Sequence, residues 1–171
     1  GEDLPVTMTG ATNQVAQYND GDNADSGTDA GTTFGTTSDR IVDLRGISQM
    51  DSASYYHTVT FNNLDPTKEY IITLTANRNN PSYANARYAR VTIEGAEAYT
   101  QASSTGVVVY SDASVSFSIG YNTLNGYVAK WTGVTSGSDG SFSVKSEWDN
   151  TQGSGTSNTK GYAMSVFCLE E

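Results

Sequence analysis

The sequence predicts an all-β fold, an antiparallel β-sandwich or jelly roll of about nine to eleven strands. It also predicts one domain spanning residues 1–171, because 18.2 kDa is enough chain to bury a real core. Three observations favour this fold class. Apolar and polar side chains alternate in short runs, residues typical of turns separate the runs, and helical spacing of apolar residues is not found over ten or more residues. The composition agrees, because seventeen Gly and eleven Tyr accompany little Leu.

The clearest strands lie in the middle of the chain. Apolar and polar residues alternate from 55 to 61 and again from 70 to 77. Between these runs, residues 62–66 (NNLDP) supply side chains that hydrogen-bond to their own backbone and a proline that fixes φ. A polar tip at 77–88 then precedes a third alternating run at 88–94. The pattern predicts strand, tight turn, strand, polar tip, strand.

The other strands are expected on both sides of this segment. Serines alternate with Val115, Phe117 and Ile119, which indicates a strand with one buried face. Two long polar loops are expected at 19–38, where only Phe34 can pack, and at 149–160. The remaining strands are expected at residues 4–9, 40–44, 98–103, 106–110, 114–119, 127–134, 142–148 and 162–169.

The charge of the chain excludes two classes of partner. Nineteen acidic and nine basic residues give a net charge of −10. Nucleic-acid binding needs a basic face, and docking on an anionic membrane needs basic side chains, so neither partner is expected. No apolar run approaches the roughly 18 residues of a membrane span, so no membrane insertion is expected. We expect an extracellular or cell-surface bacterial protein, either exported with its leader removed or a module of a larger secreted protein.

The sequence predicts a protein that is not an enzyme, because few titratable groups can converge. His57 occupies a buried-face position of a strand, and Cys168 lies in an apolar run where a thiol behaves as a small hydrophobe. One cysteine allows no disulfide within the chain. A glycosidase pair drawn from Glu94, Glu97 and Glu147 is an alternative, but exposed strand faces carry such residues routinely.

Four aspartates in the first polar loop form the candidate metal site, and the candidate cofactor is a structural Ca²⁺. Acidic oxygens that alternate along a loop containing glycine can surround a hard cation. The spacing departs from the EF-hand rule, because Ala24 takes a ligand position and Asp25 stands where glycine is needed. A solvated loop without an ion is the alternative. The four residues are Asp20, Asp22, Asp25 and Asp29.

Several short motifs between residues 59 and 148 carry a family likeness. They are 61–66 (FNNLDP), 70–74 (YIITL), 76–78 (ANR), 90–96 (RVTIEGA), 126–134 (GYV…WTGV) and 139–144 (DGSFSV). Together they resemble the non-catalytic, carbohydrate-binding-module-like β-sandwich domains of secreted bacterial carbohydrate-active enzymes and surface proteins. The resemblance covers roughly half of the chain. It implies a jelly-roll fold, an extracellular setting and a glycan or polysaccharide partner, and it transfers no ligand-contact residue.

The polar tip and two other strand ends have the composition of a glycan site. Flat aromatic rings suit the apolar faces of sugars, and amide and guanidinium groups suit their hydroxyls. We expect these strand ends to converge on one rim. The alternative is that Tyr88 and Trp148 cap the core and the tip only turns the chain, while Trp131 packs inside. The predicted ligand-binding residues are Arg78, Asn79, Tyr83, Arg87, Tyr121, Asn122, Trp148 and Asn150.

A second class of function stays open, a self-assembling extracellular subunit of a filament or surface layer. Few lysines, many Thr, Ser, Asn and Tyr residues, and strands near both termini suit a subunit that adds or exchanges an edge strand.

Overall fold

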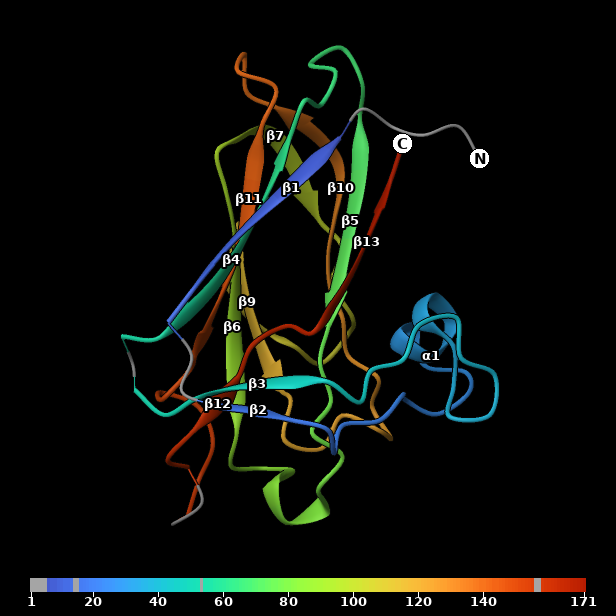
Figure 1. Ribbon diagram of the computed structural model, residues 1–171, viewed down its shortest axis with the longest axis vertical. Helices are drawn as coiled ribbons and strands as arrows, with labels where there is room; N and C mark the ends of the chain where they lie inside the picture. Colours follow the sequence, from blue (N-terminus) through green and yellow to red (C-terminus); the bar gives the residue numbers. More distant parts are fainter. Residues whose placement is uncertain (1–5, 14–15, 53, 156–157) are drawn as a thin grey trace.

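The computed structural model describes residues 6–13, 16–52, 54–155 and 158–171, and in these ranges the protein is an all-β sandwich. Two antiparallel sheets face each other across one hydrophobic core (Figure 1). The predicted fold class is therefore confirmed, while the finer jelly-roll topology stays a prediction. Among the described residues, no helix is both long and apolar enough to cross a lipid bilayer.

The larger sheet has six strands in the order β1-β4-β11-β6-β9-β8. Its long central strands pair without register shifts, β11 with β4 on one side and with β6 on the other. The strands are β1 (Thr7–Thr12), β4 (Tyr56–Asn62), β11 (Phe142–Trp148), β6 (Tyr88–Glu94), β9 (Ser114–Ser118) and β8 (Val108–Ser111).

The smaller main sheet has four strands in the order β13-β5-β10-β7. The pairing of β10 with β5 and with β7 is interrupted by register shifts, which bend this sheet over the core. The strands are β13 (Val166–Glu170), β5 (Tyr70–Thr75), β10 (Ala129–Ser136) and β7 (Ala96–Gln101).

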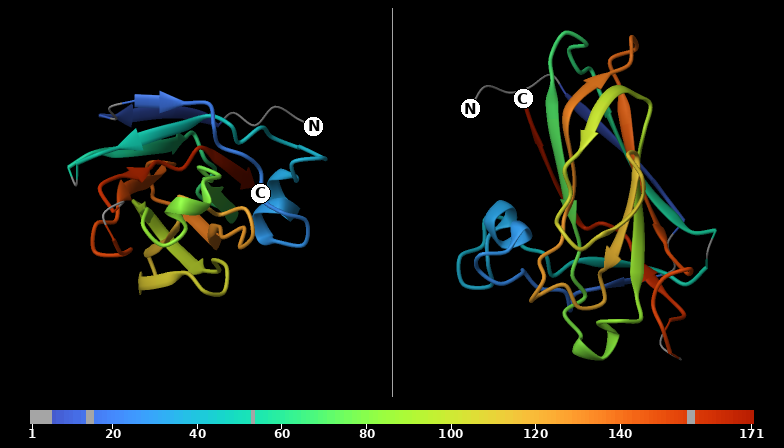
Figure 2. Two further views of the ribbon diagram at one scale, coloured as in Figure 1. Left: turned by 90° about the horizontal axis from the view of Figure 1, so that it is seen from below. Right: turned by 180° about the vertical axis from the view of Figure 1, so that it is seen from behind.

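Three short strands and two short helices complete the described structure. β2 (Ala16–Tyr18), β3 (Ile47–Met50) and β12 (Gly161–Tyr162) form a small sheet in the order β12-β3-β2, which runs across the long strands (Figure 1). These short strands bring the described total to thirteen, more than the sequence predicted. The 3-10 helix η1 (Pro81–Tyr83) lies at one end of the sandwich, and α1 (Asp29–Phe34) lies beside the sheets (Figure 2).

The core consists of the inward side chains of both main sheets. Phe61 of β4 stacks near Phe142 of β11 with ring centroids 5.2 Å apart, and meets Phe167 of β13 edge-on at 5.5 Å. Trp131 of β10 is fully buried, and its indole N–H donates to the Asp112 carbonyl at 2.8 Å. Trp131 therefore packs inside the sandwich, as predicted.

Two predicted local structures are wrong. Residues 40–44 form a bridge, bends and a turn instead of a strand, and the next strand along the chain is β3. The loop at 19–38 contains α1, whose six residues are too few to show an apolar stripe. Its N-terminus is capped by Thr28, whose hydroxyl accepts from the Gly31 N–H at 3.0 Å. Phe34 is buried as predicted, together with Ala24 and Ala30.

β9 also differs from its prediction, because both of its faces are buried. Val115 and Phe117 lie in the core as expected, but Ser116 is equally buried on the outer face. Tyr110 and residues 149–151 lie over this part of the outer face. Their contacts belong to the candidate site described below.

Candidate functional site

The predicted ligand residues lie at one end of the sandwich, which we call the loop end (Figure 1). It consists of three loops that follow β5, β9 and β11, namely residues 76–87, 119–128 and 149–155. The opposite end carries the turns 63–69 and 137–141 and the C-terminus. The expectation that these strand ends come together is therefore correct for the backbone, although the side chains have different roles.

Two buried asparagines join the first two loops. The Asn122 amide is fully buried, donates to the carbonyls of Ala76 at 3.3 Å and Tyr127 at 2.9 Å, and accepts from the Tyr127 N–H at 2.8 Å. The Asn77 side chain accepts from the backbone N–H groups of Asn79 and Asn122, both at 2.9 Å. The Asn79 side chain accepts from the Thr123 hydroxyl at 2.8 Å. Asn122 therefore has a structural role and presents no surface to a ligand.

Arg78 links the loop end to the first polar loop. Its guanidinium forms an ion pair with the Asp20 carboxylate and donates to the Asp20 carbonyl at 3.1 Å. It also lies 5.8 Å from the centre of the Tyr18 ring, and only 16% of its side chain is exposed. Arg78 is thus engaged within the protein. Tyr121 is half-buried nearby.

Arg87 and Tyr83 form a stacked pair beneath the tip. The Arg87 guanidinium lies 3.3 Å from the centre of the Tyr83 ring and 5.4 Å from that of Tyr162, and it donates to the Tyr162 hydroxyl. Burial lowers the pKa of Arg87 from its usual value. One face of the Tyr83 ring is therefore covered by Arg87, and the pair connects η1 to β12.

A depression of about 150 Å³ opens beside Trp148, and we call it the Trp148 depression. Trp148 is half-buried at the end of β11, and Asn150 is exposed on the loop that follows. The guanidinium of Arg90 approaches the depression from the neighbouring strand β6. The lining residues are Arg90, Glu147, Trp148, Asp149, Asn150 and Thr151.

Asp149 holds this depression in shape. Its side chain has no exposed surface and lies 3.3 Å from the Arg90 guanidinium. It accepts from the Tyr110 hydroxyl at 2.8 Å and from the Thr151 hydroxyl at 2.6 Å. Burial raises the pKa of Asp149, but hydrogen bonds, the largest from Thr151, outweigh burial and leave the pKa below its usual value. Arg90 also stacks on the Tyr110 ring, 4.0 Å from its centre.

A second depression, of about 270 Å³, adjoins η1 and shares the 149–155 loop. The Ser154 N–H donates to the Asn85 carbonyl at 2.8 Å, which ties this loop to the tip. Gly153, at φ +86°, lies so close that a Cβ there would be 2.7 Å from the Ala86 carbonyl oxygen. The structure therefore joins the loop bearing Trp148 and Asn150 to the tip bearing Tyr83, while Arg78, Asn79 and Asn122 support them from inside.

A larger depression, about 460 Å³, lies at the opposite end of the sandwich. Its aromatic residue, Tyr70, is buried, so it offers no exposed ring to a sugar. Its charged side chains include Lys68 and Glu171, which form an ion pair with an N–O distance of 2.6 Å. This depression is larger than the Trp148 depression, but the side chains that line it fit a glycan less well.

Three of the four candidate calcium ligands have separate partners. Asp20 pairs with Arg78, Asp22 pairs with Arg40 at 2.7 Å, and Asp29 accepts from the Ser104 hydroxyl at 2.5 Å. Asp25 is exposed. Within the described ranges, no group of three or more His, Cys, Asp or Glu side chains is arranged to hold a metal ion. Calcium binding stays a prediction.

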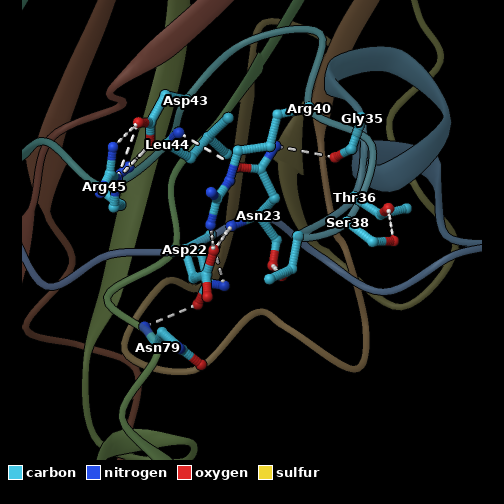
Figure 3. Close-up of polar contacts among 12 residues, drawn as sticks. Asp22, Asn23, Gly35, Thr36, Ser38, Arg40, Asp43, Leu44, Arg45 and Asn79 are labelled. Atoms are coloured by element: carbon cyan, nitrogen blue, oxygen red, sulfur yellow. Dashed lines mark hydrogen bonds and ion pairs between the residues drawn. The ribbon is translucent and has the colours of Figure 1, made fainter.

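The loop is held by Asn23, a residue that the sequence did not single out (Figure 3). Its buried amide nitrogen donates to the carbonyls of Phe34 at 3.2 Å, Gly35 at 2.9 Å and Val42 at 2.9 Å. Its amide oxygen accepts from the Arg40 guanidinium at 3.2 Å and from the Leu44 N–H at 3.3 Å. One side chain that precedes α1 thus satisfies backbone groups at the C-terminal end of α1 and in the segment that follows it.

The residues weighed for catalysis have ordinary surroundings. His57 is half-buried on the inward face of β4, and burial lowers its pKa. Cys168 is half-buried and not fully buried, and burial raises its pKa, which keeps the thiol protonated. Glu147 forms an ion pair with Lys145 at 2.8 Å, while Glu94 and Glu97 are exposed.

Arg90 and Tyr110 are the members of the site that sequence reasoning missed, together with the buried hydrogen-bonding role of Asp149. Asp149-Asn150-Thr151 carries a recognisable signal, because an aspartate two residues before a threonine often accepts from its backbone N–H, as here at 3.1 Å. The partnership with Tyr110 joins residues 39 positions apart and has no local signal.

Comparison of the chain with protein-family models, with curated proteins and with solved structures found no match. Function must therefore be argued from the geometry of the loop end.

Proposed function

We propose that this protein is a non-catalytic extracellular module that binds carbohydrate at the loop end, in the Trp148 depression. The observation that carries the proposal is the grouping of Trp148, Asn150 and Arg90 around one hollow. These are the groups that bind the apolar face and the hydroxyls of a sugar. The buried Asp149 network fixes them before a ligand arrives, which lowers the entropy lost on binding.

The size and charge of the site narrow the class of glycan. At about 150 Å³ the depression is smaller than the roughly 300–1,000 Å³ of sites that enclose a whole small molecule. A polysaccharide that lies across the loop end and inserts one sugar fits it better. The net charge of −10 repels anionic chains. The ligand class that we propose is therefore a neutral polysaccharide.

The resemblance to modules of secreted carbohydrate-active enzymes and surface proteins supports the same conclusion. Most of its motifs lie on β5, β6, β10 and β11, the strands that lead into or out of the loops of the loop end. The extracellular setting follows from that resemblance and is part of the proposal.

A glycan array followed by affinity electrophoresis in the polysaccharides that score tests the proposal. Asn150→Ala should weaken retardation at least several-fold and leave stability unchanged, because Asn150 is exposed. Trp148→Ala should abolish the retardation of the protein by the polysaccharide. Ser138→Ala, an exposed change in the large depression at the opposite end, is the matched control and should bind like the wild type. No array signal for the wild type, or a loss confined to Ser138→Ala, would reject the proposal.

A second candidate function is self-association through an edge strand, as in a filament or surface-layer subunit. The observation that favours it is β1, an outer strand of the six-stranded sheet whose six residues are all exposed. Unpaired strand edges add further strands readily. Electron microscopy of concentrated protein tests this candidate, which predicts assemblies larger than one chain.

A further inference from the structure

β1 is attached to the sandwich by one edge only. It pairs with β4 from Thr7 opposite Asn62 to Thr12 opposite His57, and no described strand lies on its other side. Met8 is opposite Phe61 and therefore points to the core-facing side of the sheet. Yet Met8 is 54% exposed, because the four-stranded sheet ends at β13 and does not reach over β1. The apolar side of β1 is thus left uncovered.

The hydrogen-bond pattern shows which backbone groups of β1 face outward. The Asn13 N–H donates to the Tyr56 carbonyl at 3.3 Å, in register with the β1–β4 pairing. Directly opposite residues in an antiparallel pair alternate between bonded and non-bonded positions. The odd-numbered residues of β1 therefore bond to β4, and the N–H and C=O groups of Met8 and Gly10 point to the free edge.

This edge lacks the features that protect the other edges of the two main sheets. β7 shifts register twice against β10 and carries Glu97, β8 has four residues and a register shift, and β13 ends at Glu170. β1 has six residues in unbroken register, with no charge and no proline. Bulges, charges and prolines are the usual means of preventing edge-to-edge pairing, and β1 uses none of them.

The charge distribution allows a second copy of the chain to approach along β1. Two copies with a net charge of −10 repel each other over most of their surfaces. The outer face along β1 and β4 is uncharged: Thr7, Thr9 and Ala11 lie opposite Asn62, Thr60 and Thr58. A partner that approaches along β1 therefore meets no like charge from these six side chains.

We infer that β1 pairs antiparallel with β1 of a second copy, about a two-fold axis at Thr9. In this register Met8 of each copy lies opposite Gly10 of the other, so the outward groups of both residues bond to each other. The absent side chain of Gly10 leaves room for the partner's exposed Met8. The two Thr9 residues form a non-hydrogen-bonded pair at the axis, with Cα atoms about 4.5 Å apart.

The symmetry sets the size of the assembly. A two-fold contact uses the same surface on both copies and closes on itself, so it produces a dimer and no fibre. A pairing of six-residue strands is smaller than the roughly 1,200–2,000 Å² of a stable interface. The dimer is therefore weak and depends on concentration, and added salt strengthens it by screening the repulsion between copies. This inference rests on the second candidate function and restricts it to a closed pair.

Sedimentation velocity of the full chain over a range of concentrations tests the pairing. The wild type should shift from monomer to dimer, with a larger dimer fraction at higher salt. Thr9→Lys places two like charges at the axis and should keep the protein monomeric. Thr100→Lys is the matched control, because Thr100 is an exposed threonine on the outer strand β7 of the other sheet. It should behave like the wild type.

Disulfide cross-linking tests the register. In a Cys168→Ser background, oxidised Thr9→Cys should give a covalent dimer, because residues opposite each other at the axis are within disulfide reach. Thr7→Cys should not, since the two Thr7 residues would be about 14 Å apart at 3.4 Å per residue. Cross-linking of Thr7→Cys but not Thr9→Cys would overturn the register. Fibres would overturn the closed pair but leave the second candidate function standing, whereas a monomer under all conditions would overturn both.

Discussion

Replacement of Asn23 by alanine should destabilise the protein more than any surface change. The Asn23 side chain is fully buried and makes the hydrogen bonds described above to the last residue of α1 and to residues that follow it. Three of its partners are themselves buried: the carbonyls of Phe34 and Gly35 and the N–H of Leu44. The other two are partly exposed and can bond to water instead.

The magnitude follows from the three buried partners. A buried polar group that loses its partner costs about 1–3 kcal/mol. Taking the lower value for each, because water can enter the space that the amide leaves, gives about 3 kcal/mol for Asn23→Ala. For a chain of this length, 1 kcal/mol shifts the melting temperature by about 2–4 °C, so a decrease of about 6–12 °C is expected.

Urea denaturation and thermal melting measure this loss, and limited proteolysis shows whether it is confined to residues 19–46. Asn23→Asp keeps the size and the acceptor oxygen but sets a carboxylate against three carbonyls, so it should destabilise at least as much as alanine. Asn150→Ala, at an exposed asparagine, should change stability by less than about 0.5 kcal/mol. A loss below about 1 kcal/mol for Asn23→Ala, with unchanged proteolysis, would refute this account of the loop.

Three further predictions concern pH and metal. Because burial lowers the pKa of His57, the unfolded chain binds its proton first, so stability should fall as pH drops below about 6.5; His57→Gln should flatten this part of the melting profile, and an identical slope in both proteins would contradict it. The pKa of Asp149 is lowered, so its contribution is complete above about pH 4 and is lost as pH falls through the folded value. Melting temperatures of wild type and Asp149→Asn should therefore differ at pH 7 and approach each other in acid, whereas a constant difference would contradict the shift. If Asp20 and Asp22 hold calcium, a chelator must lower the melting temperature. Because both carboxylates already form ion pairs with arginines, we predict that a chelator leaves the melting temperature unchanged.

Local patterns were sufficient to predict the sandwich. The alternation along β4, β5 and β6 and the turn chemistry between them depend on neighbouring residues, which the sequence displays directly. The burial of Trp131 and Phe34 followed from their apolar character. The grouping of the loops after β5, β9 and β11 also followed, because strands of a sandwich end at two rims.

Contacts between distant residues could not be predicted in this way. Asn122 and Asn23 have the composition of solvated loop residues, and only the fold shows that their amides replace missing backbone partners. Serines of β9 predicted an exposed face, but the fold places Asp149 and Tyr110 over it. α1 was missed because a six-residue helix has too few positions to display a period.

The most direct test of the proposed glycan site is a tryptophan fluorescence titration with a polysaccharide that the wild type binds. The protein has two tryptophans, of which Trp131 is fully buried in the core and Trp148 is half-buried at the loop end. A saturable change in emission is predicted for the wild type, and Trp148→Phe, which preserves an aromatic ring for packing, should lose it. Binding that leaves the emission unchanged, or an equal change in Trp148→Phe, would contradict the site.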